Sequence, residues 1–421
     1  MEQEGHRFLF PDFQGYDPKY SQSHLPVRQQ KTAEGHAVRA VYMYCAMADL
    51  AYEFQDETLL TVCRKLWENI VTKRMYLTGG IGSSGILERF TVDYDLPNDC
   101  NYSETCASIG LALFGRRMAE ITREASFMDT VELALYNTIL SGISLDGKHF
   151  FYVNPMEVWP DNCIPRTSKE HVKPVRQKWF GCACCPPNIA RTLASFGQYL
   201  YFKDDHTLYV NLYVSSQVKT RLSNEEVCVK VTTELPGKGK YVIKINSQGN
   251  KEKTLAFRIP AYGKDFQVQN ENGTILSPEI SNGYAYISGT FADTVLTVAY
   301  QEKAGFIRAN PNVRADAGKV AMMKGPVVYC LEEVDNGKNL ASIYVDADQE
   351  IKEIYEPEVM GGTLTLELEG KKISSDNWSG QSLYGTEKRK LEDVKLKAVP
   401  YSSWGNRKAG EMTVWIKELI R

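Results

Sequence analysis

The chain has 421 residues, more than one ordinary hydrophobic core accommodates, so two or three domains are expected. Its 49 Lys and Arg against 52 Asp and Glu give a net charge of −3, and this balance argues against proteins that bind nucleic acid or a membrane surface. No apolar run is long enough to span a bilayer and the acidic start, Met1–His6, has no signal-peptide core, so we expect a cytoplasmic location and no membrane partner for the chain as given.

The first half of the chain has apolar residues at helical spacing. This periodicity predicts helices over 34–54, 56–74, 101–122, 127–143 and 186–200. Asn101 and Glu104 form a candidate capping box, and Pro186 stands at a position that helices tolerate at their start. The apolar faces need burial, which predicts that residues 1–203 pack helix on helix.

In the second half the apolar residues alternate with polar ones. The alternating segments are 208–214, 227–231, 241–245, 254–259, 284–287, 295–298, 363–368 and 412–416. Turn-forming residues separate them, which is typical of antiparallel sandwiches. We predict one β-sandwich over 204–305, completed by the last strands at 405–421, and a second over 306–404.

Two connections in the helical half, 75–100 and 145–180, are too long to be simple turns. Long loops inside compact domains are usually functional or disordered. Their aromatic content favours ordered loops that carry function.

The cysteines are the unusual part of the composition. Of the ten, Cys182, Cys184 and Cys185 fall within four positions, where adjacent residues are poor disulfide partners. Glu104 and Cys106 lie at the start of a predicted helix, and one carboxylate with several thiolates can complete a tetrahedral zinc site. A helix start also lowers a thiol pKa, which suits a bound or reactive Cys184. The alternative is that Glu104 caps its own helix and the cysteines are small buried apolar residues.

Three further residues are candidates for chemistry. Glu88 has apolar neighbours, so a raised pKa would suit a general acid; an exposed loop glutamate is the alternative. His36 stands near a helix start, where a structural or solvent-facing histidine is the common case. Tyr152 precedes Asn-Pro, and such tyrosines either line a sugar site or are simply buried.

Several segments, taken together, carry a resemblance to a known family. They are Gly35-His-Ala-Val-Arg39, Tyr76-Leu-Thr-Gly-Gly-Ile-Gly82, Tyr102-Ser-Glu-Thr-Cys106, Tyr152-Val-Asn-Pro155, Cys184-Cys-Pro-Pro-Asn188 and Gly410-Glu-Met-Thr-Val-Trp415. Their order and spacing resemble glycoside hydrolase family 127, the β-L-arabinofuranosidases, and the related family 146. The resemblance extends over essentially the whole chain.

The resemblance implies retaining hydrolases built from a barrel of α-helical hairpins with β-sandwich domains behind it. It implies a zinc ion held by Glu104, Cys106, Cys184 and Cys185. It makes Cys184 the nucleophile and Glu88 the acid/base, with His36 and Tyr152 contacting the sugar. Cys182 receives no role. The implied reaction releases terminal β-linked L-arabinofuranose from oligosaccharides or glycoproteins.

The family's chains extend well upstream of the Gly-His-Ala-Val-Arg segment. A barrel of six hairpins needs twelve helices, so residues 1–203 are expected to form only the C-terminal part of an α/α barrel. An upstream half, or a second copy in a homodimer, would then be a partner. A lost upstream segment would also allow a periplasmic or secreted location.

Two other functions stay open. One is a truncated, non-catalytic protein that keeps zinc for structure and binds glycan, which an assay on an aryl β-L-arabinofuranoside separates from an enzyme. The other is a redox or thiol-transfer protein, which about one zinc per chain and unreactive thiols would exclude.

Overall fold

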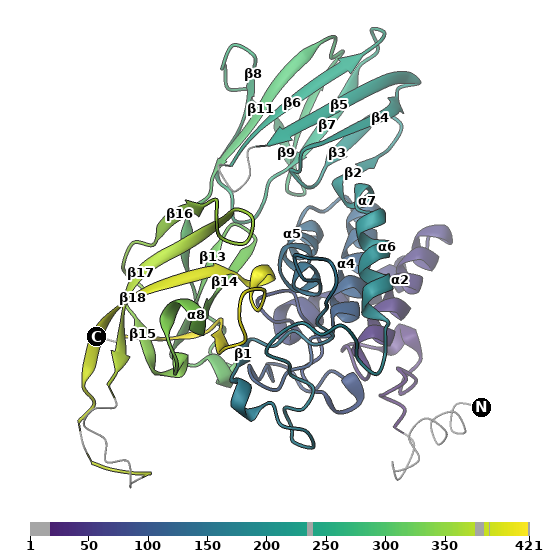
Figure 1. The fold of residues 1–421 in the computed structure, drawn as a ribbon. Coiled ribbons are helices and arrows are strands. Elements are labelled where there is room, and N and C mark those ends of the chain that lie inside the picture. Colours follow the sequence, from purple (N-terminus) through teal and green to yellow (C-terminus); the bar gives the residue numbers. More distant parts are fainter. Residues whose placement is uncertain (1–16, 234–238, 375–382, 387, 420–421) are drawn as a thin grey trace.

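The computed structural model describes residues 17–233, 239–374, 383–386 and 388–419. It contains a layer of helices followed by two β-rich parts (Figure 1). No helix among these residues is long and apolar enough to cross a membrane. This agrees with the fold class expected from the sequence at the level of a multidomain α and β protein.

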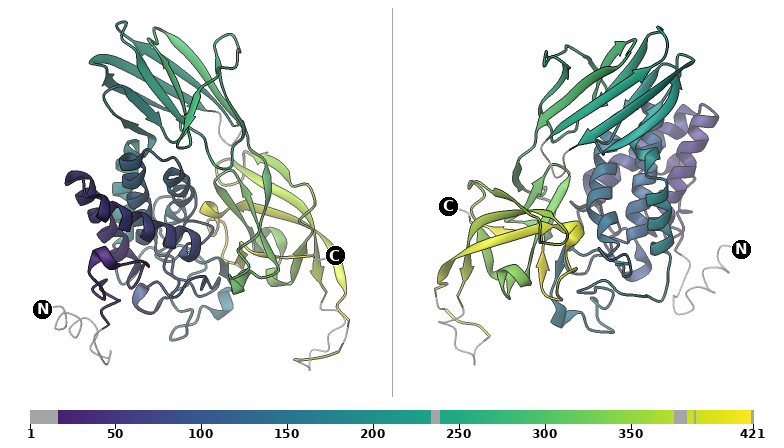
Figure 2. Two further views of the ribbon diagram at one scale, coloured as in Figure 1. Left: turned by 180° about the vertical axis from the view of Figure 1, so that it is seen from behind. Right: turned by 45° about the horizontal axis from the view of Figure 1, so that its top comes forward.

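The helical layer confirms the predicted helices, with ends shifted by a few residues. Its helices are α2 Ala37–Glu53, α3 Glu57–Asn69, α4 Thr105–Thr122, α5 Ser126–Ala134, α6 Cys185–Ala194 and α7 Gly197–Leu200, with π-helical turns at Ile70–Arg74 and Leu135–Ile139. The helices lie side by side in one layer (Figure 2), in which α4 packs against α2, α5 and α6. Most residues of α4 are buried. Its glycines permit this packing, because a Cβ on Gly110 would lie 2.4 Å from Val41 and one on Gly115 2.5 Å from Trp67.

The first β-rich part is a sandwich of two five-stranded sheets, as predicted. One sheet has the order β2-β3-β7-β10-β9 and the other β4-β5-β6-β11-β8. The strands are β2 Tyr201–Lys203, β3 Thr207–Val210, β4 Ser216–Leu222, β5 Glu225–Thr233, β6 Lys240–Ser247, β7 Lys253–Arg258, β8 Lys264–Asn270, β9 Glu279–Ser281, β10 Tyr284–Gly289 and β11 Thr294–Gln301. Alternate residues of both sheets, such as Leu255 and Val229, meet in one buried core.

The second β-rich part differs from the predicted sandwich. It contains β12 Ala304–Ile307, β13 Lys319–Lys324, β14 Val327–Glu332, β15 Ile343–Val345, β16 Lys352–Glu356, β17 Thr363–Ile373, β18 Leu391–Pro400, β19 Met412–Thr413 and β20 Ile416–Glu418, joined by β1 Glu157–Val158 from the helical half. Strands β14, β18, β17, β15, β20 and β13 pair in that order, and β13 pairs with β14 to close the ring. Closure removes sheet edges, and apolar alternation in a sequence does not distinguish a sandwich from such a barrel.

The prediction that residues 405–421 complete the first sandwich is wrong. Strand β20 pairs with β13 and β15, with Ile416 opposite Val320, and β19 pairs with β14 and β1. Residues 412–418 therefore belong to the sheet of the closed barrel and not to the sandwich (Figure 1). The physical reason is that β20 fills the gap between β13 and β15, which would otherwise leave the ring open.

The three parts meet through buried polar contacts on helix α5 and the π-helical turn after it. Arg258 of β7 is wholly buried and its guanidinium contacts Asp129 and Glu132 of α5, each at 2.5 Å. On the barrel side, the side chain of Asn137 donates to the carbonyl of Pro326 at 2.7 Å and accepts from the amide of Val328 at 2.8 Å. These bonds fix the helical layer against both β-rich parts.

Replacing Arg258 by methionine should lower the free energy of unfolding by about 3–5 kcal/mol, because it leaves the buried Glu132 and the half-buried Asp129 without their partner. Urea denaturation followed by circular dichroism measures the loss. Arg221 is the matched control: it is highly exposed and its ion pair with Glu226 spans 4.0 Å. Arg221→Met should change stability by no more than about 0.5 kcal/mol. Equal losses in the two variants would contradict the role given to Arg258.

Candidate active site

Glu104 is the N-cap residue of α4, and its side chain makes no capping hydrogen bond. The predicted capping box is therefore wrong. The side-chain amide of Asn101 instead donates to Ser103 Oγ at 2.9 Å and to the backbone carbonyl of Asn154 at 3.0 Å. The first helical amide, that of Thr105, donates to the Tyr152 carbonyl at 3.0 Å. Because the 152–154 segment satisfies the helix start, the Glu104 carboxylate is free to turn toward the cysteines.

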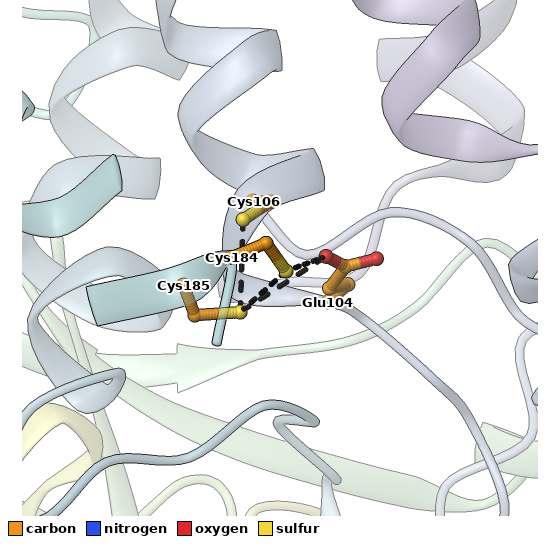
Figure 3. Close-up of side chains that lie close together, drawn as sticks. All are labelled: Glu104, Cys106, Cys184 and Cys185. Atoms are coloured by element: carbon orange, nitrogen blue, oxygen red, sulfur yellow. Dashed lines mark hydrogen bonds between the residues drawn. The ribbon is translucent and has the colours of Figure 1, made fainter. Parts of the chain in front are cut away.

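Four side chains converge between the starts of α4 and α6 (Figure 3). The Cys106 and Cys185 sulfurs lie 3.6 Å apart, those of Cys184 and Cys185 3.8 Å apart, and the Glu104 Oε1 atom is 3.4 Å from Cys184 and 4.0 Å from Cys185. A tetrahedral zinc ion with Zn–S bonds of about 2.3 Å requires sulfurs about 3.8 Å apart and a carboxylate oxygen about 3.5 Å from each sulfur. The observed separations fit this geometry.

The electrostatics of the cluster also suit a cation. Glu104 is almost completely buried, and its Oε2 atom has no hydrogen-bond partner among the described residues. Burial, followed by the charges of Glu88 and Cys184, raises the pKa of Glu104. Contacts with the Cys184 and Cys185 thiols lower the pKa of Cys106 to about 5. Buried acidic groups and a thiolate at contact distance repel one another, and a divalent cation removes that repulsion.

Glu88 is held over this cluster by a strained loop. Leu87 and Glu88 both have left-handed backbones, with φ of 60° and 51°, which non-glycine residues seldom adopt. Backbone bonds between Ser84 and Arg89 close the turn, and the amide of Phe90 donates to the Gly35 carbonyl. The turn therefore brings Glu88 beside the start of α2, where His36 stands.

His36 has two contacts that together fix its tautomer. It is the N-cap of α2, and its Nδ1 atom accepts from the Arg39 amide at 3.4 Å. The other nitrogen, Nε2, then carries the proton and donates to Glu88 Oε2 at 3.0 Å. Tyr102 donates its hydroxyl proton to the other oxygen of Glu88 at 2.9 Å. His36 is thus a helix cap and a site residue at once.

The expectation of a raised pKa for Glu88 is not met. Burial acts to raise the pKa, but hydrogen bonds from His36 and Tyr102 outweigh it, so the pKa of Glu88 lies below its usual value. Of the apolar neighbours that prompted the expectation, Ile86 is 74% exposed and Phe90 is buried. Glu88 is a carboxylate that is ready to accept a proton.

One cavity of about 530 Å³ brings these groups together. Its lining includes all the predicted site residues except the buried Cys185: His36, Glu88, Glu104, Cys106, Tyr152 and Cys184. The hydroxyl oxygen of Tyr152 accepts from the Cys184 thiol at 3.3 Å, so Tyr152 contacts the candidate nucleophile directly. Cys182 is exposed and lies on the cavity wall outside the four-residue cluster.

Sequence reasoning overlooked four residues of this site. Tyr102 holds Glu88, while Tyr42, Asn188 and Arg191 line the cavity. Two signals were present: Tyr102 precedes Glu104 by two positions, and Asn188 lies one helical turn beyond Cys184 and Cys185. Tyr42 and Arg191 had no local signal, because the side chains meet only when α2 and α6 pack.

Comparison with known families covers nearly all of the chain. Residues 4–198 match the catalytic domain of β-L-arabinofuranosidases of glycoside hydrolase family 127, residues 207–299 the middle domain, and residues 304–417 the C-terminal domain. The chain belongs to glycoside hydrolase family 127. This confirms the family resemblance, and all seven predicted site residues fall in the part that matches the catalytic domain.

Individual proteins are similar to this chain in sequence and in structure. The non-reducing end β-L-arabinofuranosidase of Bifidobacterium longum subsp. longum is 36% identical over 420 residues, which cover 97% of this chain and 63% of that protein. The crystal structure of Ara127N-Se, a family 127 β-L-arabinofuranosidase from Geobacillus stearothermophilus T6, has a TM-score of 0.93 and 43% identity, covering 99% of this chain and 66% of that one. The family 127 β-arabinofuranosidase BT3674 has a TM-score of 0.87 and 34% identity, with the same coverage. The chain thus spans slightly less than two thirds of each of these relatives.

Proposed function

We propose that this chain carries the site of a retaining glycosidase that releases terminal β-linked L-arabinofuranose from oligosaccharides or glycoproteins. The observation that carries the proposal is the four-residue cluster with tetrahedral spacing, facing the same cavity as Glu88. The names of two similar family 127 proteins, both β-L-arabinofuranosidases, support the choice of sugar.

Glu104, Cys106, Cys184 and Cys185 would hold a zinc ion. Zinc bound there would keep the thiols deprotonated and stabilise sulfur as an attacking and as a leaving group. Of the three thiols, those of Cys106 and Cys185 are buried and that of Cys184 is partly accessible. Cys184 also lines the cavity, whereas Cys185 lies behind it. Cys184 is therefore the sulfur that a substrate can reach.

The reaction follows from these positions in two steps. Cys184 Sγ attacks the anomeric carbon, the bond from that carbon to the leaving oxygen breaks, and Glu88 gives its proton to that oxygen. Glu88 then takes a proton from water, the water oxygen bonds to the anomeric carbon, and the carbon–sulfur bond breaks. Two inversions leave the anomeric configuration retained. Cys184 thus takes the place that a second carboxylate has in most retaining glycosidases.

The remaining side chains hold and orient these two groups. His36 and Tyr102 fix both oxygens of Glu88, and Tyr152 contacts Cys184. His36 and Tyr152 also face the cavity, where we expect them to bind the sugar hydroxyls. The free carboxylate is poised for the second step, since its pKa lies below the usual value. For the first step Glu88 must enter protonated.

The proposed function is tested by incubating the zinc-loaded protein with 4-nitrophenyl β-L-arabinofuranoside and its α anomer. We expect release of nitrophenol from the β anomer only, and NMR of the first product should show the β anomer of L-arabinose. Binding of the β anomer without turnover would instead indicate a non-catalytic glycan-binding protein. An α-anomeric first product would contradict the two-step mechanism.

Tyr102→Phe should move the alkaline limb of the pH–activity profile to higher pH by about one unit. Glu88 must be protonated for the first step, so activity falls as the pH rises through its pKa. The Tyr102 hydroxyl stabilises the carboxylate form, and its removal raises the pKa of Glu88 by the worth of one charge-assisted hydrogen bond, about 1.5 kcal/mol. Profiles of kcat/KM measured on the aryl glycoside show the shift.

Tyr42→Phe is the matched control for this experiment. Tyr42 lines the same cavity, but its hydroxyl accepts from Arg191 at 2.6 Å and makes no contact with Glu88. Its pH profile should coincide with that of the wild-type protein. If Tyr102→Phe also left the profile in place, Glu88 would not be the group that titrates on the alkaline side.

A further inference from the structure

A second cavity, of about 350 Å³, lies where the helical layer, the sandwich and the closed barrel meet. None of its lining residues lines the active-site cavity. The helical layer contributes Glu132 and Tyr136, the sandwich Tyr213 and Tyr241, and the barrel Tyr329, among others. A volume of this size lies in the range of pockets that hold small organic ligands.

Aromatic rings form much of the wall. Six tyrosines line the cavity: Tyr136, Tyr213, Tyr241, Tyr262, Tyr329 and Tyr355. The rings of Tyr213 and Tyr241 stack at 4.6 Å with an interplanar angle of 25°, which fixes their position. Tyr355 is 55% exposed and stands at the edge of the cavity. Flat aromatic faces next to hydroxyl groups suit the apolar faces and hydroxyls of sugar rings.

Several polar side chains on this wall have no hydrogen-bond partner among the described residues. They include the carboxylate of Glu302 and the hydroxyl of Tyr136, both on half-buried residues, and the hydroxyl of Tyr329, which is only 2% exposed. Gly325, with φ of 53°, makes room for the carboxylate, because a Cβ there would lie 2.8 Å from Glu302 Oε1. Polar groups that face a cavity and have no partner within the protein are available to bind a ligand there.

The charges around the cavity indicate which kind of ligand it takes. Glu132 is paired with Arg258, and the Lys324 ammonium is 2.9 Å from Glu353, so neither offers a free charge. Glu302 remains as an acceptor and disfavours anions. The hydroxyls of Tyr136 and Tyr329 can each donate and accept a hydrogen bond. Neutral molecules with many hydroxyl groups match these donors and acceptors.

We propose that this cavity is an accessory binding site for a neutral saccharide of one or two sugar units. The choice of L-arabinose as that sugar rests on the proposed function. The argument that the cavity binds a neutral saccharide does not depend on it. The site holds the glycan at the junction of the three parts and shares no lining residue with the active-site cavity, so one glycan can be bound while another is cleaved.

The test is an NMR titration of protein carrying ¹³C-labelled tyrosine rings with L-arabinose and with methyl β-L-arabinofuranoside. The signals of Tyr136 and Tyr329 are identified by their loss in Tyr136→Phe and Tyr329→Phe. We expect both signals to shift in a saturable manner with one dissociation constant. Glu302→Leu, which keeps the side-chain size and removes the acceptor, should raise that constant about tenfold.

Tyr286→Phe is the control, because Tyr286 packs on Tyr209 and Tyr284 in the sandwich and does not line the cavity. It should leave the dissociation constant unchanged, and melting temperatures should show that each variant is folded. Choline serves as a cationic probe in the same titration. The proposal would be overturned if the signals of Tyr136 and Tyr329 did not move with either sugar, or moved only with choline. Binding without hydrolysis by the wild-type protein would refute the proposed function alone.

Discussion

Replacing Cys184 by alanine should lower kcat/KM for 4-nitrophenyl β-L-arabinofuranoside by about 10⁴-fold or more, which corresponds to about 5.5 kcal/mol of lost transition-state stabilisation. The reason is that Cys184 is the only sulfur of the cluster that both lines the cavity and is partly accessible in the described part of the chain. Alanine supplies no nucleophile. Water, activated by Glu88 alone, would then have to attack the anomeric carbon directly, without a covalent intermediate. Steady-state assays of the zinc-loaded variant measure the loss.

Cys182→Ala is the matched control. Cys182 lies two residues earlier, is exposed and lines the same cavity, but takes no part in the cluster. It should keep activity within about twofold of the wild-type protein, since a surface thiol contributes little to stability. Zinc content shows whether Cys184→Ala retains metal on its three remaining ligands. Full activity in Cys184→Ala, or an equal loss in Cys182→Ala, would rule out the nucleophile assignment.

Replacing Cys106 by serine should remove zinc, lower the melting temperature by several degrees and abolish activity together. Cys106 comes from α4, whereas Cys184 and Cys185 belong to the start of α6, so a metal bound by all three would join the two helices. A metal that binds the folded chain stabilises it by mass action, and hydroxyl groups are poor zinc ligands. Metal analysis by mass spectrometry and thermal unfolding measure the two effects, and a chelator should reproduce both on the wild-type protein.

Cys63→Ser separates metal binding from packing. Cys63 is a buried thiol of α3 outside the cluster, so its replacement should cost some stability and leave about one zinc per chain. If Cys106→Ser kept its zinc, or if a chelator left the melting temperature unchanged, the cluster would not be a metal site. A wild-type protein without zinc but with reactive thiols would favour the thiol-transfer alternative.

The helices and strands were predicted well wherever the signal lies within one stretch of sequence. The helical spacing of α2 to α6 depends on which residues face one side of a helix, and this is visible in the chain itself. Strands whose apolar residues alternate, such as β5, β6 and β7, were also predicted. The arrangement of the strands in the second β-rich part was not predicted. Alternation of apolar and polar residues indicates that one face of a strand is buried, but it does not indicate which strand pairs with it. Pairing of β20 with β13 joins residues nearly a hundred positions apart.

The site divides in the same way. The order of the motifs identified Glu88, Glu104, Cys106, Cys184 and Cys185, and the structure places all of them at one point. Their protonation was not predictable, since the pKa of Glu88 depends on hydrogen bonds from residues on other elements. The predicted capping role of Glu104 was also wrong. The first amide of α4 donates to the backbone carbonyl of Tyr152, some fifty residues later in the chain, and so needs no side-chain cap.

The sequence by itself determined the family, through the order of its motifs, and the helical and β-rich halves, through the spacing of apolar residues. The family resemblance, and not residue spacing, implied which residues cluster in the site. Only the tertiary structure decided the closure of the barrel, the ionised state of Glu88 and the tyrosine-lined cavity at the junction of the three parts. These depend on contacts between segments that are distant in the chain, and the packing of such segments creates both the hydrogen bonds and the burial that set them.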